Sequence, residues 1–137
     1  MKSLFIGIFC LFLFTACGDV PLEKTVVHIG NQQFICELAS TKDEIEKGLM
    51  FRQELPQNTG MLFDLGEERK TGFWMKNTLI PLDIIWISKE KKVLYVVHAD
   101  PCESEYCEIF QEEDPARWIL EINAGEFQGN IDDSVKF

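Results

Sequence analysis

Along most of the chain, short runs of apolar and β-branched residues alternate with polar or glycine-containing turns. Two such runs, Thr25–Ile29 and Gln33–Leu38, are joined through Gly30-Asn31. Because both turn residues tolerate positive φ, this spacing predicts a β-hairpin. Further strands are predicted over residues 61–65, 81–87, 93–97 and 118–122. The run 81–87 is apolar apart from Asp83, which is typical of a strand covered on both faces.

One short helix is predicted between the second and third strands. Thr41 and Glu44 have the spacing of a capping box, and the helix is expected to end near Gly48. Polar or unpatterned segments are expected over residues 66–71, 100–117 and 125–137. The chain has no repeat and no low-complexity block. The pattern therefore predicts a single mainly β domain, either a barrel or a sandwich, with a short inserted α-helix.

The amino terminus has the pattern of an export signal. Lys2 precedes an unbroken run of apolar residues and glycine over residues 4–14, which is shorter than the roughly 20 residues needed to cross a bilayer. The run ends in Leu13-Phe14-Thr15-Ala16-Cys17, which resembles a bacterial lipobox. We expect a lipoprotein signal peptide over residues 1–16, a lipidated tether over 17–24 and one β-rich domain over 25–137. The alternative is an ordinary signal peptide with an incidental cysteine.

Acylation of Cys17 would make the membrane a partner of this protein, because several acyl chains on one residue hold a protein stably. Gly18 follows Cys17 at the position where an aspartate favours retention in an inner membrane. We therefore expect a lipid-anchored protein of the outer membrane, with the domain facing the periplasm or the cell surface.

Charge and composition exclude two classes of protein. The 137 residues carry 13 Lys+Arg against 23 Asp+Glu, a net charge of −10, and loss of the signal would remove one more positive charge. Neutralising phosphates requires clustered Lys and Arg, so no nucleic-acid partner is expected. With 46% hydrophobic and 12% aromatic residues, the chain can bury enough apolar surface to fold, which excludes disorder. An acidic domain is also repelled by anionic lipid headgroups.

Cys102 and Cys107 lie close together in a predicted loop. In an exported protein this spacing favours a structural disulfide, and the alternatives are a redox pair or part of a metal site. Cys36 lies in a predicted strand and is expected to be a buried free thiol.

Three methionines, Met50, Met61 and Met75, each have an aromatic residue within two positions in the sequence. Thioethers together with His28 or His98 could bind Cu(I) in an exported protein. Packing of methionine beside aromatic rings is the simpler interpretation, so no metal and no cofactor are predicted.

The stretch 74–83 is the most informative part of the chain. Asp83 lies in a strongly apolar run, where an unpaired carboxylate is costly, so it requires a partner. The candidate partners are the side chains of Arg52 and Lys76 and the backbone amides of residues 76–78.

This stretch has two interpretations. One is a structural network in which Asn77, Thr78 and Asp83 fix a turn. The other is a shallow pocket with Trp74 as an apolar or sugar-stacking wall. The ligand-binding residues of that pocket would be Arg52, Trp74, Lys76, Asn77, Thr78 and Asp83.

Several segments of the chain closely resemble the family called domain of unknown function 192. These segments are Gly48–Arg52, Gly60–Phe63, Phe73–Thr78, Pro81–Asp83, Ala99–Cys102 and Leu120–Gly125. The resemblance implies a small, mainly β and often exported domain, and it implies no established reaction. Family members commonly have Gly-Asp before the last strand, where this chain has Asp132-Asp133-Ser134.

The preferred functional interpretation is a non-enzymatic, lipid-anchored domain that binds a small ligand or an envelope protein beside Trp74 and Lys76. It rests on an export signal without a recognisable catalytic motif. The alternative is an enzyme acting on an envelope glycan or another polar substrate, with Asp83 and Glu121 as acid and base. Copper binding through the three methionines is the third interpretation.

Overall fold

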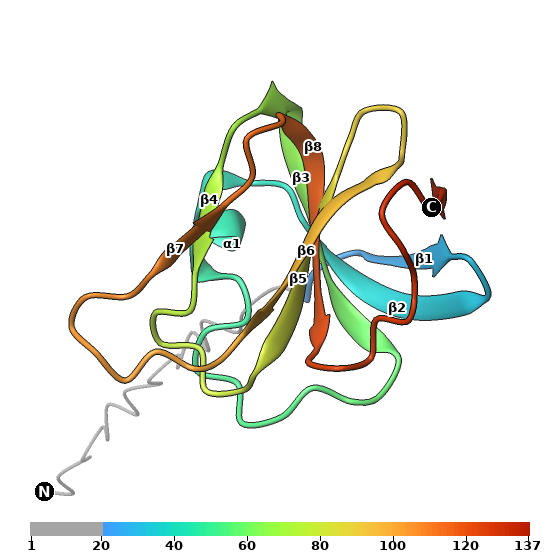
Figure 1. Cartoon of the computed structure of the whole chain (residues 1–137). Helices are drawn as coiled ribbons and strands as arrows, with labels where there is room; N and C mark the ends of the chain where they lie inside the picture. The colour runs from blue at the N-terminus through green and yellow to red at the C-terminus, as the bar shows by residue number, and fades with distance from the viewer. Residues whose placement is uncertain (1–20) are drawn as a thin grey trace, which may run out of the picture.

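The computed structural model describes residues 21–137, which form nine strands and one short helix (Figure 1). In chain order the elements are β1 Lys24–Ile29, β2 Gln32–Ala39, α1 Lys42–Lys47, β3 Thr59–Arg69, β4 Gly72–Trp74, β5 Leu82–Ile87, β6 Val93–Ala99, β7 Ile109–Gln111, β8 Ala116–Asn123 and β9 Val135–Lys136. The predicted signal peptide and Cys17 lie outside the described residues. Within residues 21–137, no helix is long and apolar enough to span a membrane.

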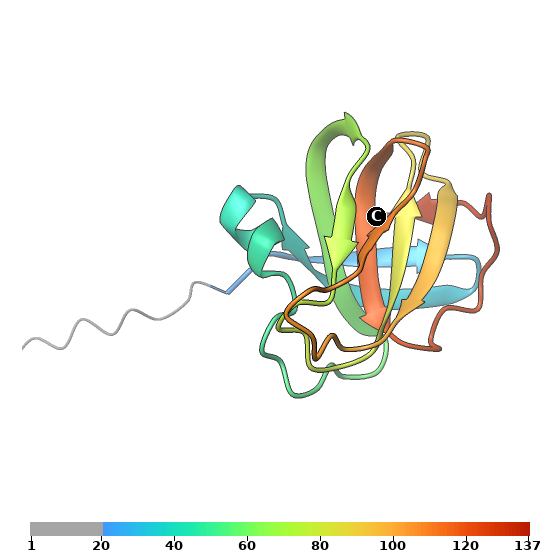
Figure 2. The same cartoon turned by 60° about the vertical axis from the view of Figure 1, so that its left-hand side comes forward.

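Seven strands form one sheet in the order β6-β5-β8-β3-β2-β1-β9. All neighbours in it are antiparallel except β2 and β3, which run parallel. The sheet curls strongly into a half-barrel (Figure 2), while β4 and β7 form a separate antiparallel ribbon on the same side of it as α1 (Figure 1). The prediction of a single mainly β domain with one short helix is confirmed, and the half-barrel answers the choice between barrel and sandwich.

A segment near the carboxyl terminus links the two edges of the half-barrel. Val135 in β9 pairs with Ile29 in the edge strand β1. Just before it, Asp132 donates its backbone N–H to the carbonyl of Val93 at 2.8 Å, and Val93 donates its own to the carbonyl of Asp133 at 3.0 Å. Because Val93 begins the opposite edge strand β6, this segment bridges the gap between the edges.

The curled sheet separates two hydrophobic clusters. The inner cluster takes side chains from all seven strands, including Phe34, Leu62 and Leu120, and fills the concave side. The outer cluster lies between the opposite face of the sheet, the segment after α1 and the β4–β7 ribbon. All six residues of β5 are buried, which confirms the prediction of a strand covered on both faces. Because both faces of these strands are buried, a polar side chain in them needs a partner inside the protein or a place at a site.

Predictions that depend on adjacent residues are confirmed. Ile29 lies opposite Gln32, so Gly30-Asn31 is the whole turn of the first hairpin. Both hydrogen bonds of the capping box between Thr41 and Glu44 are present, and Gly48 ends the helix at φ 47°.

Two predicted loops are wrong in part, and the segment without a predicted structure contains a strand. Strand β3 continues through a bulge to Arg69, where a polar loop was expected. Strand β7 lies inside the predicted loop 100–117, and β9 lies inside the unpatterned segment 125–137. Each of these additions pairs with a strand that is distant in sequence, so no local pattern announces it.

Candidate functional site

A row of side chains on the outer face of the sheet forms the floor of the candidate site. Glu37 of β2 lies opposite Met61 of β3, which in turn lies opposite Glu121 of β8. Ile84 of β5 is the next residue across the sheet. Because neighbouring strands are about 4.8 Å apart, the backbones of Glu37 and Glu121 lie roughly 10 Å apart on either side of Met61. Two carboxylates therefore share this face, and their surroundings differ sharply.

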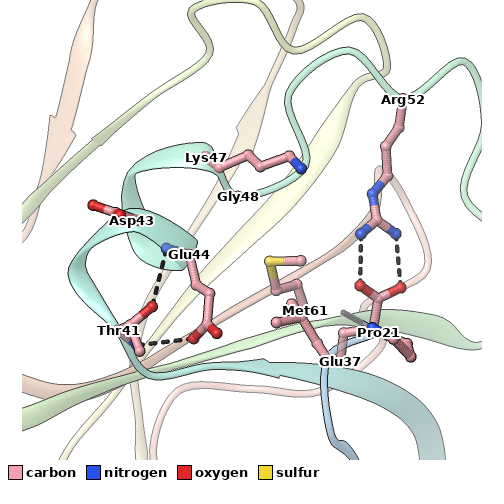
Figure 3. Close-up of a pocket in the computed structure, with 10 residues that line it drawn as sticks. Pro21, Glu37, Thr41, Asp43, Glu44, Lys47, Gly48, Arg52 and Met61 are labelled. Carbon is pink, nitrogen blue, oxygen red and sulfur yellow. Dashed lines mark hydrogen bonds and ion pairs between the residues drawn. The ribbon is translucent and has the colours of Figure 1, made fainter. Parts of the chain in front are cut away.

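The first of these carboxylates borders an open hollow of about 440 Å³ beside α1 (Figure 3). Arg52 donates two hydrogen bonds to Glu37, one of 2.9 Å to Oε1 and one of 2.6 Å to Oε2. The bonds from Arg52 lower the pKa of Glu37, so this carboxylate stays ionised and paired. Across the hollow, the Glu44 carboxylate accepts hydrogen bonds from the backbone of Ser40 and Thr41. The carboxylates of Glu37 and Glu44 are therefore both hydrogen-bonded to other groups of the protein.

The second carboxylate, Glu121, borders a small cavity of about 30 Å³ that we call the Glu121 cavity. Its wall includes Gly48, Met50, Phe63, Phe73, Trp74 and Thr78. The Glu121 residue is 5% exposed, and among the described residues its carboxyl has no hydrogen bond or ion pair. Since no fully enclosed polar side-chain atom of the described residues lacks a partner, the Glu121 carboxyl oxygens keep a small exposed surface, and Glu121 is one of the residues that line the cavity.

Burial raises the pKa of Glu121 to about 8. Desolvation is the single cause, because no neighbouring charge stabilises the ionised form. At neutral pH the group is therefore mostly a neutral carboxylic acid. An unpartnered buried polar group costs folding free energy, and such groups concentrate at functional sites.

The loop above the cavity is held in an unusual backbone conformation. Phe51 has φ 65°, a value that bulky side chains rarely adopt, and Asn77 has φ 58°, which asparagine adopts more readily. The backbone N–H of Phe51 donates to the carbonyl of Asn77 at 2.8 Å, and the amide of Asn77 contacts the sulfur of Met50 at 3.9 Å. These contacts join the segment after α1 to the segment after β4 at the mouth of the cavity. Phe51 is 64% exposed and Trp74 46% exposed, so two aromatic side chains lie open to solvent there.

A cation and a disulfide lie beside Trp74. The ammonium nitrogen of Lys76 is 5.3 Å from the centre of the Trp74 ring. Lys76 also forms an isolated β-bridge with Cys102, and Cys102 is bonded to Cys107. The predicted disulfide is confirmed, and it constrains the loop that leads into β7. Cys36 is buried and free, as predicted.

Asp83 faces the opposite side of the sheet. It lies opposite Ile122 of the inner cluster, and its Oδ2 accepts the backbone N–H groups of Gly125 at 2.8 Å and Phe127 at 3.1 Å. Its Oδ1 lies 3.3 Å from Nδ1 of His98. The predicted partners at residues 52 and 76–78 are therefore wrong, and so is the network joining Asp83 to Asn77 and Thr78. Asp83 instead fixes the chain where it leaves β8.

The structure thus divides the six predicted ligand-binding residues. Trp74 and Thr78 line the Glu121 cavity, and Lys76 and Asn77 lie beside it. Arg52 borders the open hollow, and Asp83 lies on the far face. The pairing of Asp83 with Glu121 as acid and base is wrong, because the sheet separates the two carboxyls and Asp83 has both oxygens occupied.

The position of Glu121 in a cavity of its own was not predicted from the sequence. This residue was considered only as a partner for Asp83, although a glutamate in the middle of the apolar run 118–122 was the available signal. The role of Glu37 as the partner of Arg52 was missed because the two residues are in unrelated segments of the chain.

The methionines are placed as packing predicts. Met61 and Met75 are both 1% exposed and belong to the outer cluster. Met50 is partly buried at the wall of the Glu121 cavity. Residues 21–137 contain no group of three His, Cys, Asp or Glu side chains placed to hold a metal ion. Copper binding remains a prediction.

The fold is a mainly β single domain with a half-barrel sheet and one short helix. The chain belongs to the family DUF192, described as "Uncharacterized ACR, COG1430", which matches residues 25–136. A comparison with curated proteins found no match.

Two solved structures are similar to this chain. One, from Sinorhizobium meliloti 1021, is described as a candidate transcription regulator; it is 33% identical with a TM-score of 0.80, over 87% of this chain and 97% of that one. The other, a protein of unknown function from Novosphingobium aromaticivorans DSM 12444, is 34% identical with a TM-score of 0.78, over 85% of this chain and 86% of that one. The segments that carry the family resemblance include most of the wall of the Glu121 cavity.

Proposed function

We propose that this protein is a lipid-anchored envelope protein whose domain binds a small ligand at the Glu121 cavity and its mouth. The lipobox-like ending at Cys17 supports the anchor and the export. The Glu121 carboxyl has no partner among the described residues, and this supports the binding site, because a ligand that pairs with it would offset the cost of its burial. Trp74 and Thr78 line the cavity and would supply an apolar and a polar contact to the ligand.

Binding is a better account of this site than catalysis. The acid and base considered from the sequence lie on opposite faces of the sheet, so the proposed glycan-cleaving pair is lost. A regulator of transcription would have to meet DNA, and the excess of carboxylates over Lys and Arg opposes contact with phosphates. The description of the Sinorhizobium protein therefore does not extend to this chain in our proposal.

The anchor is tested by metabolic labelling with radioactive palmitate in a Gram-negative host. The full chain is expected to incorporate label and to fractionate with membranes, whereas Cys17→Ala is expected to lose both properties. Labelling that persists in Cys17→Ala would remove the anchor from the proposal without touching the binding site.

The site is tested by measuring the melting temperature of the domain against amines, saccharides, carboxylates and divalent metal ions. At least one class is expected to raise the melting temperature, and Glu121→Gln and Trp74→Ala are expected to abolish the rise. The matched control is Glu54→Gln, which makes the same chemical change at an exposed glutamate. If no class shifts the wild type, or if the shift survives in both site variants, the site is misassigned.

A further inference from the structure

We propose that the ligand of the Glu121 cavity carries a protonated amine, and that its ammonium end enters the cavity and pairs with the Glu121 carboxylate. This inference rests on the binding site proposed above and names the class of ligand that the site accepts.

The size of the cavity restricts what can enter it. About 30 Å³ is the space of one or two water-sized groups, so an ammonium or a methyl-substituted ammonium fits. A sugar ring, a nucleobase or an aromatic acid is too large to enter and could only rest on the mouth. The group that reaches Glu121 must therefore be small and polar, whatever the size of the rest of the ligand.

The walls of the cavity suit a cation. Phe63, Phe73 and Trp74 line the cavity together with Glu121, and the faces of aromatic rings attract cations. Trp74 already has such an interaction with the ammonium of Lys76. Aromatic rings around one carboxyl form the environment in which proteins bind alkylammonium groups, and the net charge of −10 attracts cations to the domain.

Binding of the amine is accompanied by loss of a proton from Glu121. Burial raises the pKa of Glu121 to about 8, which favours the carboxylic acid over the carboxylate at neutral pH. When an alkylammonium enters, Glu121 releases its proton to solvent, and the carboxylate and the ammonium form an ion pair inside the cavity. No proton leaves the amine, so one proton is released for each ligand bound to a protonated site.

The other charged groups near the cavity do not provide an alternative partner for the Glu121 carboxylate or for the amine. Glu46 and Lys47 of α1 are at the wall, and Lys47 has a partner of its own. The neighbouring carboxylate in the sheet, Glu37, is paired with Arg52 and does not compete for a cation. Lys76 lies against Trp74 outside the cavity and repels an entering cation. His98 lies on the opposite face beside Asp83.

The experiment is a titration of the domain with methylammonium chloride at constant ionic strength, followed by the indole N–H resonance of Trp74 and by calorimetry. Ethanol is the neutral analogue and acetate the anionic one. Methylammonium is expected to shift the Trp74 resonance saturably, and its affinity is expected to rise about tenfold from pH 6 to pH 7 and to level off above pH 8. Calorimetry in buffers of different ionisation enthalpy is expected to show net proton release on binding at pH 7, and less release at pH 9.

Variants separate the amine from other ligands. Glu121→Gln is expected to abolish binding of methylammonium, and Glu54→Gln to leave it unchanged. Lys76→Met is a surface substitution that removes a competing cation, so methylammonium is expected to bind roughly two- to fivefold more tightly to it. Weaker binding of methylammonium to Lys76→Met would contradict repulsion by this lysine and would overturn the placement of the ammonium beside Glu121.

The outcomes also separate this inference from the proposed function. If ethanol or acetate binds saturably and Glu121 is required, but methylammonium does not bind, the inference of an amine ligand is wrong. The proposed binding site at the Glu121 cavity would still stand. Absence of binding by all three probes, together with no shift in the broader melting survey, would overturn both.

Discussion

Asp83 and Glu121 are one register position apart on neighbouring strands, yet they face opposite sides of the sheet and differ in every other respect. The Asp83 carboxylate accepts two backbone N–H groups and lies beside His98. The Glu121 carboxyl has no partner among the described residues. One acid holds the fold together, whereas the other weakens it. That contrast separates a structural acid from a candidate ligand-binding acid.

Substitution of Glu121 by glutamine is expected to stabilise the domain at neutral pH. The pKa of Glu121 is raised from 4.5 to about 8 in the folded state, so the folded state holds a proton that the unfolded state has lost between these values. The contribution of this group is fully present below pH 4.5 and is lost as the pH rises towards 8. The free energy of unfolding of the wild type is expected to fall by up to about 1.4 kcal/mol per pH unit in this window.

Urea denaturation at pH 5, 6, 7 and 8 measures this effect. Glu121→Gln is expected to lose most of the slope, while Glu54→Gln is expected to keep it. Parallel curves for the wild type and Glu121→Gln would show that Glu121 is not a buried acid. On the acid side, Arg52 and Arg117 lower the pKa values of Glu37 and Asp64, so stability is also expected to fall below pH 4.5.

Gly60→Ala is expected to destabilise the domain by about 3 kcal/mol. A Cβ at this position would lie 2.4 Å from the carbonyl oxygen of Glu121 and 2.8 Å from the side chain of Ile122, so β3 and β8 would have to separate. Thermal or urea denaturation measures the loss. Gly30→Ala is the comparison, because nothing lies near its Cβ and only the positive φ costs energy, about 1 kcal/mol. Equal losses at the two positions would contradict close contact between the strands.

Asp83→Ala is expected to cost about 2–4 kcal/mol, because the backbone N–H groups of Gly125 and Phe127 lose their acceptor. Hydrogen exchange of these two amides is expected to accelerate more than exchange in β3. Asp83→Asn keeps one carbonyl oxygen and is expected to cost less. Ligand binding at the Glu121 cavity is expected to survive both substitutions, and a selective loss of binding in a folded Asp83→Asn domain would show that the two faces are coupled.

Removal of the disulfide by replacing Cys102 and Cys107 with serine is expected to cost about 2 kcal/mol, as for any short closed loop. Amide exchange in β4 and β7 is expected to increase more than exchange in the central strands, because the bond closes the loop that leads into β7. Cys36→Ala is the matched control, since it changes a buried free thiol and leaves the β4–β7 ribbon alone. Uniform acceleration across the whole sheet would contradict a local role for the bond.

The parts of the fold that follow from adjacent residues were predictable. Gly30-Asn31 predicts its hairpin and Thr41 with Glu44 predicts its helix start, because both signals are local hydrogen-bond geometry. Pairing of β4 with β7 was not predictable, since each strand has three residues and the two are separated by more than 30 positions.

The candidate site was predictable only in part for a related reason. Trp74 and Thr78 were found because they belong to one unusual stretch of sequence. Asp83 was misplaced because its strand alternates between two buried faces, and the sequence of such a strand does not tell which face a given side chain takes. Glu121 has the same ambiguity, and its isolation becomes visible only when the loop that covers it is in place.

The pairing of Ile29 with Val135 joins residues more than 100 positions apart, and the segment 132–135 is what lies between the two edges of the half-barrel. During synthesis, β1 and β2 emerge long before that segment does. Until it arrives, β1 is an open edge strand, able to pair with another copy of the chain. Protection against aggregation is therefore acquired late in folding, and a chain interrupted before residue 132 would keep both edges open.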